Sequence, residues 1–406
     1  MRKYLGVALG IIASLGGFVD IGELVFDSQA GATFGYRVLW AIPIGVVAIT
    51  VFSELSGRVA AVTGQANMDL VRDRYPRWLA TVTLVSGLVV CLITLSAELG
   101  GLGLVLHYAL GWNEGFFTLV ALVLLVASSV LLHFQTIEKV FGYAALGILV
   151  YVVAAVHHGP AWSSIGGGFV PDGGSAQYWY FVVALIAAGT MPYEIYFYSS
   201  GGIEEGWTEK DLGVNRANSL VGYPLGGIVA ISIAVVAAQQ LLPLQLTPEN
   251  LGTTLMQASH ELGPIGFYAA VVGAFFAIGG STIDSAFSCA YNLAQHQRWR
   301  WGKKNGIWNN KKWAAALFGA FGIGYAVVQT RVDPAALTEY AVIGSALAMP
   351  LSFWPVVRTS QDPELMGSHA SGAIARPLAW LFFGVVCVVA TTGPVLMVVT
   401  HMGALP

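Results

Sequence analysis

Long runs of apolar residues fill most of this chain, and short polar stretches separate them. About 20 mostly apolar residues are enough for a helix to cross a bilayer. The pattern therefore predicts an all-α polytopic membrane protein whose helices span the bilayer. Eleven such segments can be delimited, at residues 4–33, 37–62, 78–110, 115–133, 139–157, 177–203, 216–241, 263–294, 312–330, 336–357 and 376–402.

Two of these segments are interrupted by polar residues near their middle. The first carries Asp-Ile-Gly-Glu at 20–23, and the sixth carries Thr-Met-Pro-Tyr-Glu at 190–194. We expect Gly22 to break the first helix, so that Asp20 and Glu23 splay around a pocket. A charged side chain at the bilayer centre costs at least about 2.5–3.5 kcal/mol, so these carboxylates need a reason to be there. Paired broken helices in corresponding positions of two halves are typical of secondary transporters with inverted repeats.

The positions of the two interruptions also predict the domain organisation. Segments one to five and six to ten form two comparable blocks, and each block opens with a broken helix. We therefore predict a five-plus-five inverted repeat. The first repeat covers 1–157, a Gly- and Pro-rich external linker covers 158–176, the second repeat covers 177–357, and 358–406 holds an eleventh helix and the C-terminus.

The charged residues support this count. Only 10% of residues are charged and 56% are hydrophobic, whereas a soluble domain carries about 25% charged residues. If the N-terminus is cytoplasmic, only Arg37 and Arg331 of the basic residues fall outside, as the positive-inside rule requires. We expect a bacterial-type plasma membrane, a retained first helix after Met1-Arg2-Lys3, and an external C-terminus.

Other functional classes find little support in the sequence. The basic cluster 298–312 contains several tryptophans and is typical of an interfacial loop rather than of a nucleic-acid site. The three cysteines lie far apart and suggest neither a disulfide framework nor a metal site. Hydrolase motifs and a phosphate-binding loop are absent from the sequence. We expect neither an enzyme nor a bound cofactor, and the expected partners are a transported ion and the lipid bilayer.

The residues around the two breaks suggest a cation site. Asp20, Glu23 and Glu194 supply carboxylates, and unwound backbone supplies carbonyl oxygens that can coordinate a cation. The thioether of Met191 is a softer ligand, which favours a transition metal over magnesium or calcium. Each carboxylate could instead cap a half-helix, and Met191 could simply pack in the core.

Three further acidic residues lie inside the predicted spans. Asp27 falls one turn beyond the first break, towards the expected external mouth. Glu98 and Asp284 lie deep in the third and eighth segments. Ionisable groups at such depths are candidates for ion or proton pathways. The alternatives are a solvated rim position for Asp27 and structural hydrogen bonds for Glu98 and Asp284.

At these motifs the chain resembles the NRAMP divalent-metal transporters. That family has Asp-Pro-Gly-Asn in its first helix and Met-Pro-His-Asn in its sixth, where this chain has Asp-Ile-Gly-Glu at 20–23 and Met-Pro-Tyr-Glu at 191–194. Further similar stretches lie at 27–40, 62–76, 346–350 and 362–367. The resemblance covers nearly the whole chain.

The resemblance implies a LeuT-type fold with eleven or twelve helices and proton-linked uptake of manganese or iron by alternating access. Carried over residue by residue, the family's metal ligands correspond to Asp20, Glu23, Met191 and the backbone carbonyl of Ala188. The acidic residue of the family's third helix corresponds to Glu98.

Several positions depart from the family pattern. Glu23 and Glu194 replace asparagines, Tyr193 replaces a histidine linked to proton coupling, Leu95 replaces an aspartate and Ala348 replaces a glutamine. The site therefore gains two carboxylates and loses its histidine. Clustered carboxylates cannot all ionise while the site is empty, so binding of a divalent cation should displace protons.

Without the histidine, other groups must carry any coupled proton. The candidates for the proton pathway or for gating are Asp27, Glu98, Tyr193 and Asp284.

Three functions remain open at this point. The first is a transporter of divalent transition metals with Asp20, Glu23, Met191 and Glu194 among its ligands. The second is a transporter of the same fold that carries an organic cation or an amino acid. The third is a metal sensor that retains the fold without transport.

Overall fold

The structure is a computed structural model, and it describes residues 11, 18–246, 248, 251–304 and 306–404. The start of the first predicted segment, at 4–10 and 12–17, lies outside the described residues. So do the basic residues Arg2 and Lys3, on which part of the predicted orientation rests, and the last two residues, 405–406.

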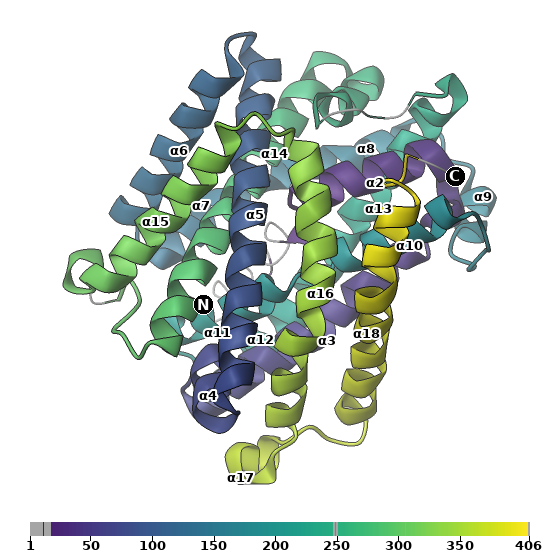
Figure 1. The fold of residues 1–406 in the computed structure, drawn as a ribbon. Coiled ribbons are helices and arrows are strands. Elements are labelled where there is room, and N and C mark those ends of the chain that lie inside the picture. Colours follow the sequence, from purple (N-terminus) through teal and green to yellow (C-terminus); the bar gives the residue numbers. More distant parts are fainter. Residues whose placement is uncertain (1–10, 12–17, 247, 249–250, 305, 405–406) are drawn as a thin grey trace.

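Throughout the described ranges the chain is built from helices and turns, with no β-strand (Figure 1). Among the described residues, nine helical stretches are long and apolar enough to cross a membrane. The helices of the first half are α2 (Ile21–Phe34), α3 (Ala41–Thr63), α4 (Asn67–Arg74), α5 (Arg77–Leu110), α6 (Glu114–Leu131), α7 (Phe134–Ala145), α8 (Val150–His157) and α9 (Trp162–Gly167). Those of the second half are α10 (Ala176–Ala188), α11 (Pro192–Glu205), α12 (Leu212–Ala217), α13 (Tyr223–Gln240), α14 (Leu251–His296), α15 (Lys311–Val328), α16 (Pro334–Ser360), α17 (Pro363–Met366) and α18 (Ala375–Val399).

The predicted segments agree closely with these helices. All ten segments from 37–62 onward coincide with helices, and the first contains α2. The sequence pattern missed the short helices α4, α9 and α17 and the first turns of α14. The start of α14 was missed because Gly263 and Pro264 interrupt the helical pattern, and Gly263 has a φ of 63° in the structure.

The second half of each broken helix packs against one long helix. Helix α2 packs along α13, and α11 packs along α3. In the predicted repeats these are equivalent pairs, since each joins the second half of a broken helix to the long helix that follows the broken helix of the other repeat. Helices α5 and α14 pack against each other, and Figure 1 shows α5, α16 and α18 running side by side along the molecule. The division into two repeats stays a prediction.

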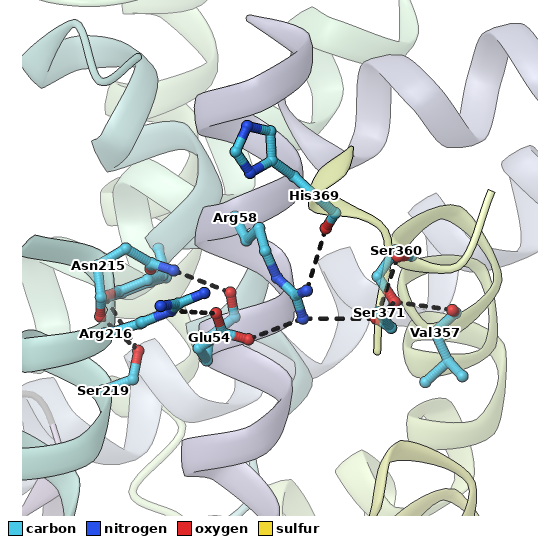
Figure 2. A network of polar contacts seen from close by, with 10 residues as sticks. Glu54, Arg58, Asn215, Arg216, Ser219, Val357, Ser360, His369 and Ser371 are labelled. Atoms are coloured by element: carbon cyan, nitrogen blue, oxygen red, sulfur yellow. Dashed lines mark hydrogen bonds and ion pairs between the residues drawn. The ribbon is translucent and has the colours of Figure 1, made fainter. Parts of the chain in front are cut away.

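A buried ion pair ties together helices from both predicted halves (Figure 2). Arg58 on α3 forms a 2.9 Å ion pair with Glu54 and donates a 3.1 Å hydrogen bond to the carbonyl of His369. The backbone carbonyl of Glu54 accepts a 3.0 Å hydrogen bond from Asn215 on α12. Arg58 also contacts Ser371, after α17, at 3.4 Å. These contacts hold the segment between α17 and α18 against α3.

At the opposite end, the linker between the predicted repeats is anchored by Arg37. Its guanidinium lies 2.6 Å from Asp172 and holds the pKa of that carboxyl below its ordinary value. Arg37 also donates to the carbonyl of Gly173 at 2.8 Å. The linker is therefore fixed to the chain segment that follows α2.

The close approach of α2 to α13 depends on Gly31. A Cβ added to Gly31 would lie 2.1 Å from the carbonyl oxygen of Ala234 on α13, whereas one added to Gly87 on α5 would meet nothing within 4 Å. We expect Gly31→Ala to lower stability by about 1–3 kcal/mol, because overpacking must push the two helices apart. Thermal unfolding of the purified protein in detergent measures the effect. Gly87→Ala is the matched control, and equal melting temperatures for the two variants would contradict the prediction.

Candidate functional site

The first helix break lies directly before Asp20. The backbone of Asp20 is extended, at φ −103° and ψ −163°, and α2 begins at the next residue. Asp20 Oδ1 accepts a 2.5 Å hydrogen bond from the N–H of Gly22, and Glu23 Oε2 accepts a 3.2 Å hydrogen bond from the N–H of Asp20. This reciprocal arrangement is a capping box.

The capping box differs from the arrangement expected from the sequence. Gly22 was expected to break the helix, with Asp20 and Glu23 splayed around a pocket. Instead Gly22 and Glu23 are helical, and both carboxylates bind orphan N–H groups at the N-terminus of α2. The physical reason is that these N–H groups have no intrahelical partner and no water inside a bilayer.

The second break separates α10 from α11. Helix α10 ends at Ala188, and α11 begins at Pro192, which suits the first helical position because it has no N–H to satisfy. In a continuous helix, the carbonyl of Ala188 would accept from the N–H of residue 192. Because proline lacks that N–H, the carbonyl of Ala188 is left without its helical donor.

The two breaks lie next to each other. A Cβ added to Gly22 would lie 3.7 Å from the Cβ of Ala188, and one added to Gly189 would lie 3.4 Å from the ring of Phe18. The hydroxyl of Tyr193 donates a 3.2 Å hydrogen bond to Asp20 Oδ2. The structure therefore brings Asp20 and the end of α10 together, far from solvent.

The side chains at this junction are almost entirely buried. Asp20 is 2% exposed, Ala188 3% and Met191 1%. Met191 is the N-cap residue of α11, but its side chain makes no capping hydrogen bond. A carboxylate, a thioether and a carbonyl without its helical donor thus belong to one buried region.

A chain of hydroxyl groups connects Asp20 to Glu98. The Tyr193 hydroxyl lies 2.9 Å from the hydroxyl of Ser281 on α14, and Ser281 donates to Glu98 Oε1 on α5. Glu98 is fully buried. Ser281 was not predicted from the sequence. The only feature of the sequence that could have indicated Ser281 is its polar side chain within the apolar segment that also contains Asp284.

Four of the predicted acidic residues keep one buried oxygen without a hydrogen-bond partner. An unsatisfied buried acceptor costs about 1–3 kcal/mol, and more when it is charged. These atoms therefore favour a bound proton, water or cation. They are Glu23 Oε1, Asp27 Oδ2, Glu98 Oε2 and Glu194 Oε2.

The side chain of Glu194 lines a cavity beside the junction of the two breaks. This cavity of about 100 Å³ is also lined by Tyr193 and Asp284, and neither Asp20 nor Glu23 is among the described lining residues. Within the described ranges, no three Asp, Glu, His or Cys side chains converge closely enough to hold a metal ion. The metal-binding role of the predicted residues stays a prediction.

Known proteins share this architecture. The model of the Natural resistance-associated macrophage protein-like family matches residues 10–395. The divalent metal cation transporter MntH of Ralstonia nicotianae is 27% identical over 93% of this chain and 88% of its own length. MntH 1 of Pseudomonas aeruginosa, also named a divalent metal cation transporter, is 24% identical over 95% and 90%.

Solved structures show the same fold. A mutant of the Eremococcus coleocola manganese transporter matches with a TM-score of 0.76 at 16% identity, over 98% of this chain and 88% of its own. A nucleobase-cation-symport-1 family transporter in a closed conformation matches with a TM-score of 0.59 at 13% identity, over 98% and 91%. The prediction of a LeuT-type, all-α membrane protein is thereby confirmed.

The family match over nearly the whole chain and the relatives, which are named as transporters, place the chain among the membrane transporters rather than among the enzymes, as predicted. Within that class the match is more specific. The chain belongs to the Nramp family.

The capping box separates two roles of Asp20. Asparagine caps helices as well as aspartate does, whereas alanine does not, and loss of a cap costs about 1 kcal/mol. We expect Asp20→Asn to leave thermal stability nearly unchanged and Asp20→Ala to lower it by about that amount. Melting temperatures in detergent test this. Equal losses for both variants would show that the charge, and not the cap, stabilises α2.

Proposed function

We propose that this protein transports divalent transition-metal ions, manganese or iron, across the membrane by alternating access. The observation that carries the proposal is the meeting of the two helix breaks around Asp20, Met191 and the carbonyl of Ala188. Family membership and the names of the relatives support it.

The electrostatics of the junction suit a cation only because of the Asp20 carboxylate and the carbonyl groups at the end of α10. The N-termini of α2 and α11 both lie there, and helix N-termini carry partial positive charge. The carboxylate of Asp20 and the C-terminal carbonyls of α10 offset that charge. The thioether of Met191 favours a transition metal over magnesium.

Glu23 can serve both as a helix cap and as a ligand in this proposal. One of its oxygens caps the N–H of Asp20 and the other is free. It can therefore approach a bound ion without giving up the cap, and it adds charge where the family has a neutral amide.

We further propose that transport is linked to protons through Tyr193 and Ser281. Three contacts join Asp20, Tyr193, Ser281 and Glu98, but the two hydroxyl groups provide only two protons between them. A third proton, held by either Asp20 or Glu98, completes the chain. A cation that binds ionised Asp20 therefore favours the arrangement with the proton on Glu98.

Uptake of manganese into proteoliposomes tests the transport proposal. Loss of a buried charged partner costs about 2–5 kcal/mol, so Asp20→Asn should weaken Mn²⁺ binding at least about 30-fold and abolish uptake. Because asparagine preserves the cap, the loss would report the charge alone. Calorimetric titration with Mn²⁺, Mg²⁺ and Ca²⁺ measures the affinity.

Two outcomes of that test support the other functions. Saturable binding of an organic amine without metal flux would favour a carrier of organic cations or amino acids. Metal binding that depends on Asp20 without any flux would favour a sensor. Glu23→Asn restores the family residue and shows whether the extra carboxylate sets the preference among the three ions.

The proton link is tested with Tyr193→Phe. Removing the hydroxyl interrupts the chain, and a positioned proton-transfer group contributes about 100-fold or more. We expect Mn²⁺ binding to persist while proton movement, followed with a pH-sensitive dye in the vesicles, falls by roughly that factor. Tyr196→Phe is the control, since Tyr196 lies on the same helix but donates to the carbonyl of Ser352. Unchanged coupling in Tyr193→Phe would rule out this route.

A further inference from the structure

The cavity beside Glu194 contains more acidic groups than the break residues explain. Its described lining includes four carboxylates, Glu138 from α7, Glu194 and Glu205 from α11, and Asp284 from α14. No lysine, arginine or histidine is among the described lining residues. A largely buried set of like charges needs protons or a cation to neutralise it.

The hydrogen bonds of these carboxylates leave room for a ligand. Glu194 is 8% exposed, and its Oε2 has no hydrogen-bond partner although it lines the cavity. Glu205 accepts a 2.7 Å hydrogen bond from the indole N–H of Trp207. Four carboxylates around one cavity repel one another unless a proton or a cation lies among them.

The dimensions of the cavity favour an ion that keeps its water. One water needs about 10–15 Å³ of such space, so a cavity of about 100 Å³ accommodates roughly seven water-sized groups. That is enough for one ion with a hydration shell. Across the described residues no three acidic side chains converge on a single point, which disfavours direct coordination of a bare ion. Hydrogen bonds from the ion's waters can reach carboxylates that are too far apart to bind the ion directly.

We propose that this cavity is a second cation site, which holds a hydrated divalent ion among Glu138, Glu194, Glu205 and Asp284. The inference rests on the proposed transport of divalent metals. Tyr193 connects the two sites, because its hydroxyl binds Asp20 while its side chain lines the cavity. An ion that leaves Asp20 on this side enters a space where it recovers water before it reaches the membrane surface.

The aromatic lining does not change this assignment. Phe141, Phe197, Tyr198 and Tyr223 surround the carboxylates, and aromatic faces also attract organic cations. An organic ammonium ion would fill the space with its own carbon atoms. A hydrated metal uses the same space for water and meets the scattered carboxylates without requiring them to converge.

The test uses purified full-length protein and two probes, Mn²⁺ and hexamminecobalt(III). The second probe imitates a hydrated ion, but it cannot exchange its ammonia ligands for Asp20 or Met191. Mn²⁺ binding is followed by electron paramagnetic resonance and calorimetry. We expect two classes of Mn²⁺ site, of which hexamminecobalt(III) displaces only one. The double variant Glu138→Gln/Glu205→Gln should weaken that class about tenfold or more and leave the other unchanged.

Controls separate this proposal from the transport proposal. Asp20→Asn should remove the class that hexamminecobalt(III) leaves in place. Glu209→Gln, which alters an exposed carboxylate of the adjacent loop, should change neither class. Thermal unfolding shows whether each variant is folded.

Each possible result contradicts a different part of the proposals. A single class of Mn²⁺ site that depends on Asp20 and ignores the double variant overturns the second site but not transport. Displacement of the cavity-bound ion by methylammonium and not by hexamminecobalt(III) overturns the hydrated-metal assignment. Absence of Mn²⁺ binding and flux altogether overturns the proposed function, and the second site with it.

Discussion

The structure depends on one constraint, that backbone groups freed by a helix break inside a bilayer must find partners within the protein. At the first break, the side chains of Asp20 and Glu23 satisfy the freed N–H groups of α2. At the second break, Pro192 begins α11 without an N–H and deprives the Ala188 carbonyl of its donor. At the first break, carboxylate oxygens are therefore occupied by hydrogen bonds to the backbone. At the second break, the carbonyl oxygen of Ala188 remains without its helical donor. The ligands available to a cation are those that remain after these backbone requirements are met.

The sequence predicted those parts of the molecule that depend on local pattern. Apolar length was sufficient for ten helical segments, and proline at 192 was sufficient for the second break. The first break was predicted near its true position, but it was attributed to Gly22. Aspartate followed three residues later by glutamate is the signature of a capping box, and the structure adopts this capping alternative for Asp20 and Glu23. The contacts of Ser281 could not be predicted, because they depend on how α5, α11 and α14 pack together.

Neighbouring positions on α11 illustrate why a family pattern does not determine a site. Successive residues of an α-helix point about 100° apart, so the side chains of Tyr193 and Glu194 leave α11 in different directions. The tyrosine hydroxyl reaches Asp20, and the glutamate lines the cavity with Asp284. Replacing both family residues at once therefore changes two environments. It introduces a hydroxyl that binds Asp20, and it adds a carboxylate to the lining of the cavity.

The contact between Gly31 and the backbone of Ala234 has a mechanical consequence. Where two helices touch through backbone atoms, no side chain remains between them to change rotamer and absorb a shift. We therefore expect helices α2 and α13 to move together, with Asp20 at the start of α2. A shift of this pair that α11 does not share would change the distance from Asp20 to Tyr193 and so open or close the chain of hydroxyl groups.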